Sequence, residues 1–343
     1  MIRVLIVDDS ALVRRLVTTA LEADPAITVV GAAVNGRDGV EQVLALDPDL
    51  VVLDIEMPEM DGLTALEKIR AERPRLPVIM FSTLTERGAR QTLDALARGA
   101  SDYLAKPSGA GSLSASIAAV RDELAPKIVA LVGARRVASA QPAPVVRRRI
   151  AKHAPDALLI GCSTGGPDAL AHLLAPLPAD FPLPIAVVQH MPPVFTGMLA
   201  ARLDGLSGLT VREAATGDVM RPGQVLLAPG DQHLALERSG TSVQARLNSE
   251  PPENFCRPAV DVLFRSAVEV YGGNVIAVIL TGMGQDGLVG VQALSARGAT
   301  VVAQDQASSV VWGMPGAVVG AGLAHEVVAL DALPARLRGL AEG

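Results

Sequence analysis

The sequence predicts two α/β domains in series, each built on a doubly wound and mostly parallel sheet. Short apolar runs alternate with amphipathic segments along most of the chain, as parallel strands and crossover helices do. The 343 residues suffice for two buried cores. Half of the residues are hydrophobic and only 2% are aromatic, so aliphatic side chains should fill these cores. The predicted boundaries are residues 1–124 for the first domain, 125–155 for a linker and 156–343 for the second domain.

The composition also limits the class of protein. No apolar run approaches the ~18 residues that a membrane-spanning helix needs. The first strand reaches an acid at Asp8, too early for a signal peptide. Two cysteines imply neither a disulfide framework nor a zinc cluster, and the net charge of −6 argues against binding to nucleic acid. We therefore expect a cytoplasmic protein that is not inserted in a membrane.

Five apolar runs are predicted as the strands of the first domain. The segment after Ser10 repeats apolar residues at helical spacing, and Ser10 is suited to cap its first turn. In such a sheet, function is expected at the carboxyl ends of the strands. The predicted strands are residues 4–7, 28–34, 50–53, 77–81 and 100–105.

Polar residues follow four of these strands in an order that predicts phosphoryl chemistry. Three carboxylates at one sheet edge repel one another unless a hard cation joins them, which predicts Mg²⁺. A carboxylate can also attack a phosphoryl group to form an acyl phosphate, whose oxygens a lysine and a hydroxyl would hold. The alternative, that each acid only caps a strand in solvent, is disfavoured because all five groups occur in order. These groups are Asp8, Asp9, Asp54, Ser82 and Lys106.

The segments VLIVDDS, VVLDIEMPEMDGL and DYLAKP resemble the two-component receiver family. The resemblance implies a receiver-type domain in which Asp54 accepts the phosphoryl group from a histidine kinase. It also implies Mg²⁺ bound by Asp9 directly, by Asp8 through water and by the backbone of Glu56. The positions of the family's switch hydroxyl and switch aromatic residue are matched by Ser82 and Tyr103.

The predicted linker is basic. Residues 127–153 hold seven lysines and arginines and no acid, and Pro and Ala dominate the middle. This composition predicts a partly extended tether. An arm that binds DNA or lipid is the alternative, since basic clusters bind phosphates. The absence of aromatic residues for base stacking favours the tether.

The second domain opens with a buried strand, a tight turn and a helix. The apolar run Ala157–Ile160 leads into small residues, and Pro167 suits the first position of a helix. Ser163 lies at the turn in a G-x-S-x-G pattern with Gly161 and Gly165. A hydroxyl there faces the N–H groups of a helix N-terminus, which predicts a nucleophilic serine. A glycine-rich turn that binds phosphate, or that only reverses the chain, is the alternative.

The rest of the second domain predicts further strands of a mostly parallel sheet, with an antiparallel hairpin near residues 223–247. A turn and a helix are expected at 308–319. The predicted strand segments are residues 183–190, 223–236, 274–287 and 300–306.

Among the five histidines, His190 is the best candidate to serve Ser163. It ends a buried strand that should lie beside the serine strand, and Asp286 follows another buried strand in a glycine-rich turn. Serine, histidine and aspartate at three strand ends of one sheet are what nucleophilic hydrolysis requires. No metal or cofactor motif occurs in this domain. The other histidines lie in the linker, in a helix, in a turn and near the C-terminus: His153, His172, His233 and His325.

Six motifs resemble the chemotaxis protein-glutamate methylesterases, the CheB family, across residues 157–335. They are GCSTGGP, VVQHMPP, LAPGDQH, PPENFCRPAVDVLFRSA, LTGMGQDG and SSVVWGMP. Cys162 departs from the family, in which alanine is more usual beside the serine. The resemblance implies a receiver-controlled esterase that demethylates glutamates, and deamidates specific glutamines, on cytoplasmic helices of methyl-accepting chemoreceptors.

The resemblance also implies roles for single residues. Ser163 would be the nucleophile, His190 the general base and Asp286 the residue that orients it. Met283 would supply an oxyanion N–H, and Thr164 would line the substrate site. The unphosphorylated receiver is expected to cover this site.

Two alternatives come from other classes of protein. The first is a phospho-switched adaptor that binds receptors without catalysis. The second is a transcription factor that uses the basic linker, although the sequence has no helix-turn-helix pattern.

Overall fold

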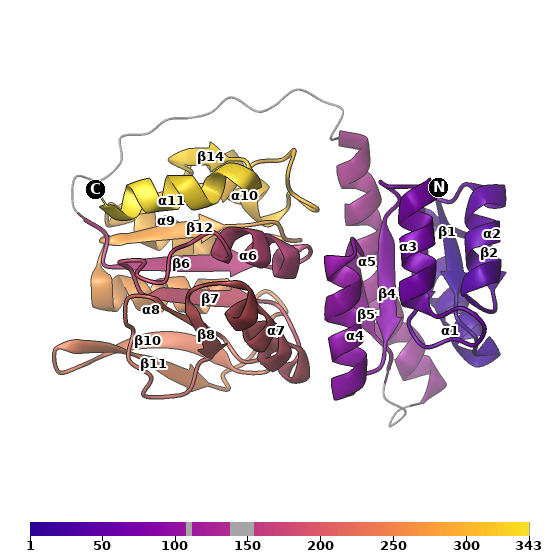
Figure 1. Ribbon diagram of the computed structural model, residues 1–343, viewed down its shortest axis with the longest axis horizontal. Helices are drawn as coiled ribbons and strands as arrows, with labels where there is room; N and C mark the ends of the chain where they lie inside the picture. The colour runs from indigo at the N-terminus through magenta and orange to yellow at the C-terminus, as the bar shows by residue number, and fades with distance from the viewer. Residues whose placement is uncertain (108–111, 138–153, 343) are drawn as a thin grey trace. The chain divides into compact units, whose positions relative to one another are not determined.

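The computed structural model describes residues 1–107, 112–137 and 154–342, and the chain divides into two compact units, Met1–Ser139 and Ala140–Gly343 (Figure 1). The first unit is a five-stranded parallel sheet in the order β2-β1-β3-β4-β5. All five predicted strands are confirmed within two residues at each end. They are β1 (Ile2–Val7), β2 (Ile27–Ala33), β3 (Leu50–Asp54), β4 (Val78–Ser82) and β5 (Asp102–Ala105).

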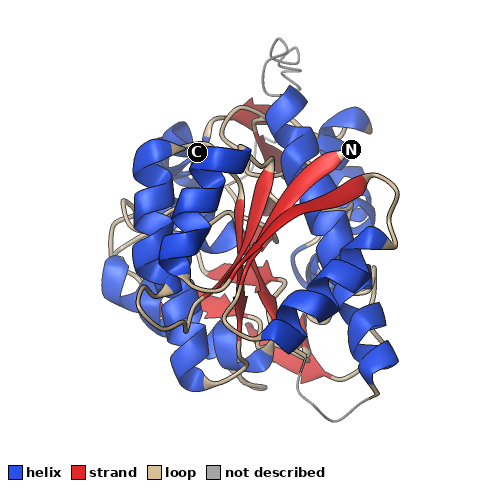
Figure 2. Ribbon diagram, turned by 90° about the vertical axis from the view of Figure 1, so that its right-hand side faces the viewer, coloured by secondary structure: helices blue, strands red, loops and turns tan. Residues whose placement is uncertain are grey.

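Helices cover both faces of this sheet (Figure 2). The predicted cap is confirmed, because the Ser10 hydroxyl accepts a hydrogen bond from the N–H of Val13. Asn35, Asp61 and Thr85 cap the next three helices in the same way. The helices are α1 (Ala11–Glu22), α2 (Gly36–Leu46), α3 (Gly62–Glu72), α4 (Glu86–Ala97) and α5 (Leu113–Val137).

Helix α5 corrects the prediction that the linker begins at residue 125. The helix continues through Pro126, a residue that removes a backbone donor and usually ends a helix, as far as Val137. The ammonium of Lys127 contacts Asp102 at 2.7 Å and the carbonyl of Tyr103 at 3.1 Å, which joins this part of α5 to β5. Residues 138–153 of the predicted linker, including His153, lie outside the described residues.

The second unit contains a seven-stranded sheet in the order β14-β13-β12-β6-β7-β9-β8, and every adjacent pair is parallel. The prediction of a mostly parallel sheet is therefore confirmed. The strand order reverses at β6, which lies between β12 and β7, so the segments that follow these three strands meet at one edge. The strands are β6 (Ala157–Cys162), β7 (Ile185–Gln189), β8 (Thr210–Glu213), β9 (Gln224–Leu227), β12 (Val275–Ile279), β13 (Thr300–Gln304) and β14 (Glu326–Val328).

An antiparallel hairpin lies outside this sheet. It pairs β10 (His233–Ser239) with β11 (Ser242–Asn248), as predicted for this region, whereas β9 belongs to the parallel sheet. The helices of the second unit are α6 (Gly166–Leu174), α7 (Pro193–Leu206), α8 (Val260–Tyr271), α9 (Leu288–Ala296), α10 (Met314–Gly320), η1 (Leu330–Ala332) and α11 (Leu333–Glu342). No helix of the described part of the chain is long and apolar enough to span a bilayer.

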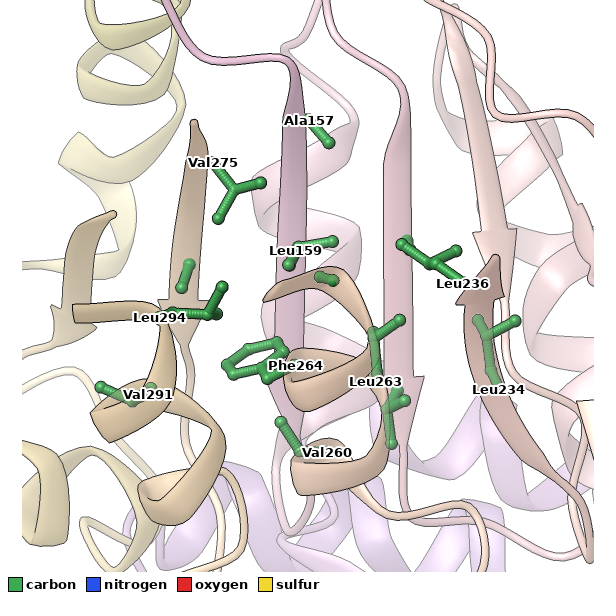
Figure 3. Close-up of a cluster of buried hydrophobic side chains, with 14 of the residues drawn as sticks. Ala157, Leu159, Leu234, Leu236, Val260, Leu263, Phe264, Val275, Val291 and Leu294 are labelled. Carbon is green, nitrogen blue, oxygen red and sulfur yellow. The ribbon is translucent and has the colours of Figure 1, made fainter. Parts of the chain in front are cut away.

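Helix α8 packs on the centre of the sheet, and its N-terminus lies beside the end of β6. Phe264 and Leu263 of α8 are buried with Leu159 of β6 in one hydrophobic cluster (Figure 3). Gly161 makes the close approach possible, because a Cβ there would lie 2.4 Å from Cγ1 of Val260. The first turn of α8 therefore reaches the sheet edge at which β6 ends.

Candidate active site and phosphorylation site

Three carboxylates of the first unit converge at the carboxyl ends of β1 and β3. Oxygens of Asp8, Asp9 and Asp54 lie within 4.8 Å of one another, and the first and third of these residues are buried. Lys106, after β5, places its ammonium 2.8 Å from Oδ1 of Asp54 and 2.9 Å from Oδ2 of Asp8. The structure thus brings together four of the groups that the sequence placed at this edge.

Burial and the neighbouring charges shift the pKa values of Asp54 and Lys106 in opposite directions. Burial raises the pKa of Asp54 to about 6, although the hydrogen bond and charge of Lys106 act to lower it. Burial lowers the pKa of Lys106, but Asp54 and Asp8 outweigh that effect and raise it. Three clustered carboxylates offer oxygen ligands only, which is the donor set that Mg²⁺ prefers, so these residues fit that ion.

Of the remaining predicted receiver residues, two lie beside Asp54 and one does not. Ser82 and Glu56 line the same cavity as Asp54. The Ser82 hydroxyl is buried and shares a 2.7 Å hydrogen bond with the Thr92 hydroxyl. Tyr103 does not line this cavity; its buried ring lies 5.6 Å from the ammonium of Lys127 on α5, and burial raises the pKa of its hydroxyl well above the usual value.

In the second unit, Ser163 follows β6 at the turn into α6, as predicted. Its N–H donates to the carbonyl of Thr281 at 3.0 Å, and its carbonyl accepts hydrogen bonds from the N–H of Gly166 and from Nε2 of Gln189. Gly165 caps α6 with a φ of +76°, a conformation that favours glycine. Ser163 is half-buried.

His190 and Asp286 form a hydrogen-bonded pair. His190 follows β7, which pairs with β6, and Asp286 follows β12 on the other side of β6. Nε2 of His190 lies 2.8 Å from Oδ2 of Asp286. The N–H groups of Val260 and Asp261, in the first turn of α8, also donate to the Asp286 carboxylate, at 2.6 and 3.1 Å. The helix N-terminus therefore stabilises the charge of Asp286.

The other nitrogen of His190 faces a thiol. Sγ of Cys256 lies 3.4 Å from Nδ1 of the ring, and no hydrogen bond among the described residues joins the Ser163 hydroxyl to His190. Since Asp286 binds Nε2, Nδ1 is the nitrogen that can accept a proton from a nucleophile. The sequence did not predict a role for Cys256, which occurs there only as part of the motif PPENFCRPAVDVLFRSA.

The contact between His190 and Asp286 shifts the pKa of both residues. Burial alone lowers the pKa of His190, but the hydrogen bond to Asp286 and the contact with Cys256 outweigh it and raise the pKa to about 9. Burial acts to raise the pKa of Asp286, but His190 and the N–H groups of α8 outweigh it, and this pKa is lowered. Asp286 is therefore charged at neutral pH.

Sequence reasoning also missed Asn254. Its amide Nδ2 lies 3.0 Å from Oδ1 of Asp286 and 3.0 Å from Oδ2 of Asp261, so one amide group donates to both carboxylates. Burial, together with the charge of Asp286, raises the pKa of Asp261, which also accepts a hydrogen bond from the N–H of Gly290. Asn254 thus bridges the carboxylates of two buried acids.

Thr164 and Met283 belong to the segments that follow β6 and β12. No residue of the described ranges accepts a hydrogen bond from the N–H of Met283. Gly282, which precedes it, approaches the serine so closely that a Cβ there would lie 3.0 Å from Cβ of Ser163. Thr164 is buried, and its carbonyl accepts a hydrogen bond from the Thr281 hydroxyl.

The other described histidines serve the fold. The buried ring of His233 accepts a hydrogen bond from the N–H of Ala259 and contacts the carbonyl of Pro251, and the buried ring of His325 accepts one from the N–H of Val301. Neither belongs to the His190–Asp286 pair, and His172 lies exposed on α6.

The carboxylate cluster of the first unit is typical of a response regulator, and the His190–Asp286 pair beside Ser163 in the second unit is typical of a hydrolase. The chain is therefore a response-regulator protein with a hydrolase domain. The CheB methylesterase family matches residues 158–337, and the response regulator receiver domain family matches residues 4–118. The chain belongs to the CheB methylesterase family.

Individual relatives agree with this assignment. A protein from Nocardioides sp. is 53% identical over 352 residues, which cover 99% of this chain and 96% of the relative. One from Trichodesmium erythraeum is 47% identical and covers 96% of both chains. Both are named protein-glutamate methylesterase/protein-glutamine glutaminase. The crystal structure of the Thermotoga maritima CheB methylesterase catalytic domain is 45% identical and covers 55% of this chain and 100% of its own, with a TM-score of 0.54.

Proposed function

We propose that this chain is a phosphorylation-activated serine esterase that hydrolyses glutamate methyl esters of chemoreceptors and deamidates specific receptor glutamines. The observation that carries the proposal is the His190–Asp286 pair, held at the sheet edge where Ser163 follows the neighbouring strand. The names of the relatives and the attached receiver unit support the same activity. A receptor-binding adaptor would not require this histidine–aspartate pair.

The reaction begins with attack of the Ser163 hydroxyl on the ester carbonyl. Nδ1 of His190 accepts the proton of the hydroxyl, while Asp286 holds the other ring nitrogen and stabilises the imidazolium. Because the thiol of Cys256 contacts Nδ1 in this structure, it must move away before the Ser163 hydroxyl can donate its proton to that nitrogen.

The tetrahedral intermediate then collapses. His190 returns the proton to the leaving methoxide, so methanol departs and an acyl-serine remains; water hydrolyses this ester and leaves a glutamate carboxylate. On a glutamine side chain the leaving group is ammonia. The N–H of Met283, for which no acceptor occurs within the described residues, stabilises the oxyanion, and Thr164 lines the site beside the nucleophile.

The receiver unit supplies control. Asp54 accepts a phosphoryl group from a chemotaxis histidine kinase, and Lys106 and Ser82 hold the transferred oxygens. Mg²⁺ would be held by Asp8, Asp9, Asp54 and the backbone of Glu56, and when bound it neutralises charge on the phosphoryl group. Phosphorylation adds nearly two negative charges, to which Ser82 and Tyr103 respond by shifting, and this change in the receiver unit activates the esterase.

Methanol release from methylated receptor fragments tests the proposal. Wild type, Asp54→Ala and Ser163→Ala are compared with and without a small phosphodonor and Mg²⁺. Release should rise with the phosphodonor in wild type, lose that rise without Asp54 and vanish without Ser163. Full activity of Ser163→Ala would refute the assignment. If wild type releases no methanol from any receptor fragment but binds the fragments, the adaptor function applies instead.

A further inference from the structure

A tight reverse turn lies beside the candidate active site. The N–H of Cys256 donates to the carbonyl of Glu253 at 2.8 Å, and the N–H of Glu253 donates back at 3.1 Å. The two central residues, Asn254 and Phe255, have φ values of +50° and +64°. Two successive positive φ values define the mirror-image turn that prefers glycine, asparagine or aspartate. Asparagine meets that preference, and phenylalanine does not.

Neither the backbone nor packing explains a phenylalanine at this position. A bulky residue rarely adopts a positive φ. The Phe255 side chain is also 104% exposed, the highest value of any large hydrophobic residue in the described part of the chain, so it gains nothing from burial. A strained conformation that the fold does not need is typical of a functional position.

The surrounding contacts hold Phe255 at a fixed place. The guanidinium of Arg265 binds the Glu253 carboxylate through two hydrogen bonds, at 2.9 and 2.6 Å, and so joins the turn to α8. The residue before Phe255 donates to Asp286, and the residue after it contacts His190. The two sequence neighbours of Phe255 therefore contact Asp286 and His190.

We propose that Phe255 is a recognition residue that packs against an apolar side chain of the receptor segment next to the glutamyl ester. The inference rests on the proposed function. A polypeptide that delivers a side-chain ester to Ser163 and His190 must pass over the residues that flank them. An exposed aromatic ring on a turn that is held in place is the kind of group that dominates binding at protein interfaces. A small ester would not extend to it.

The test compares a protein substrate with a small one. Wild type, Phe255→Gly and Leu206→Ala are assayed with and without phosphodonor, and hydrolysis of a methylated receptor fragment is measured beside hydrolysis of p-nitrophenyl acetate. Glycine suits a φ of +64°, so Phe255→Gly should fold and melt at or above the wild-type temperature. Leu206, 49% exposed at the end of α7, is the matched apolar control.

We expect Phe255→Gly to lower the ratio of receptor to small-ester kcat/KM by about tenfold, mainly through KM, while Leu206→Ala keeps the wild-type ratio. An unchanged ratio in Phe255→Gly would overturn the inference and leave the proposed function intact. A rise in activity without phosphodonor would also overturn it, because the ring would then serve as a contact for the receiver unit. If Ser163→Ala hydrolyses both substrates at the wild-type rate, the proposed function fails and the recognition role fails with it.

Discussion

Sγ of Cys256 lies 3.4 Å from Nδ1 of His190, the one ring nitrogen that Asp286 does not bind. The thiol thus occupies the direction from which the proposed general base must receive a proton. It also contributes to the raised pKa of His190. This contact makes Cys256 a second partner of the histidine.

The first prediction concerns the pH dependence of the esterase. General-base catalysis needs neutral His190, and its pKa of about 9 means that the protonated ring predominates at neutral pH. The kcat/KM of wild type should therefore rise about tenfold per pH unit up to pH ~9. Cys256→Ala removes one cause of the raised pKa, so its profile should move to lower pH. Profiles of the two proteins that coincide would show that the thiol does not act on His190.

The second prediction is inhibition by a thiol reagent. Cys256 is half-buried, whereas Cys162 is fully buried and burial raises the pKa of its thiol far above the usual value. N-ethylmaleimide should therefore label one cysteine and block access to Nδ1, with loss of esterase activity. Cys256→Ala should resist both labelling and inhibition. Mass spectrometry that finds the label on Cys162 would contradict this prediction.

The third prediction concerns Asp286. Asp286→Asn removes the charge that stabilises the imidazolium and should lower kcat for a small ester by roughly 10⁴-fold. Asp261→Asn is the matched control, because Asp261 is a buried acid beside Asp286 for which no contact with His190 occurs within the described residues. It should cost less than about tenfold. Equal losses in the two variants would mean that the charge of Asp286 has no special role.

The fourth prediction concerns Asn254. Without its amide, the carboxylates of Asp286 and Asp261 lose a shared donor and repel each other more strongly. Asn254→Ala should lower kcat with little change in KM. Asn254→Asp, which adds a third acid, should lower kcat further and destabilise the fold by about 1–3 kcal/mol. Melting temperatures and kinetics measured together would separate the two effects.

The sequence predicted most of the fold because aliphatic strands and capped helices are local patterns. Convergence of strand ends also placed Ser163, His190 and Asp286 at one edge. Cys256 and Asn254 could not be found in this way, because tertiary contacts bring their turn to the site, among them the two hydrogen bonds between Arg265 of α8 and Glu253. Neither residue type signals its role without the histidine and the acids that it contacts.

The C-terminal part of helix α5 could not be predicted for a similar reason. Pro126 and the basic residues after it are typical of a linker, but tertiary contacts keep the segment helical. Lys127 lies within the predicted linker, but its partner, Asp102, lies on β5 of the first unit.

The Lys127–Asp102 ion pair has a practical consequence for dividing the protein. The two side chains are only 15% and 6% exposed. A receiver fragment that ended at Leu124 would omit the lysine and break this buried ion pair, a change that costs about 3–5 kcal/mol. Fragments intended for phosphorylation studies should therefore extend past Val137, so that the whole of α5 is retained.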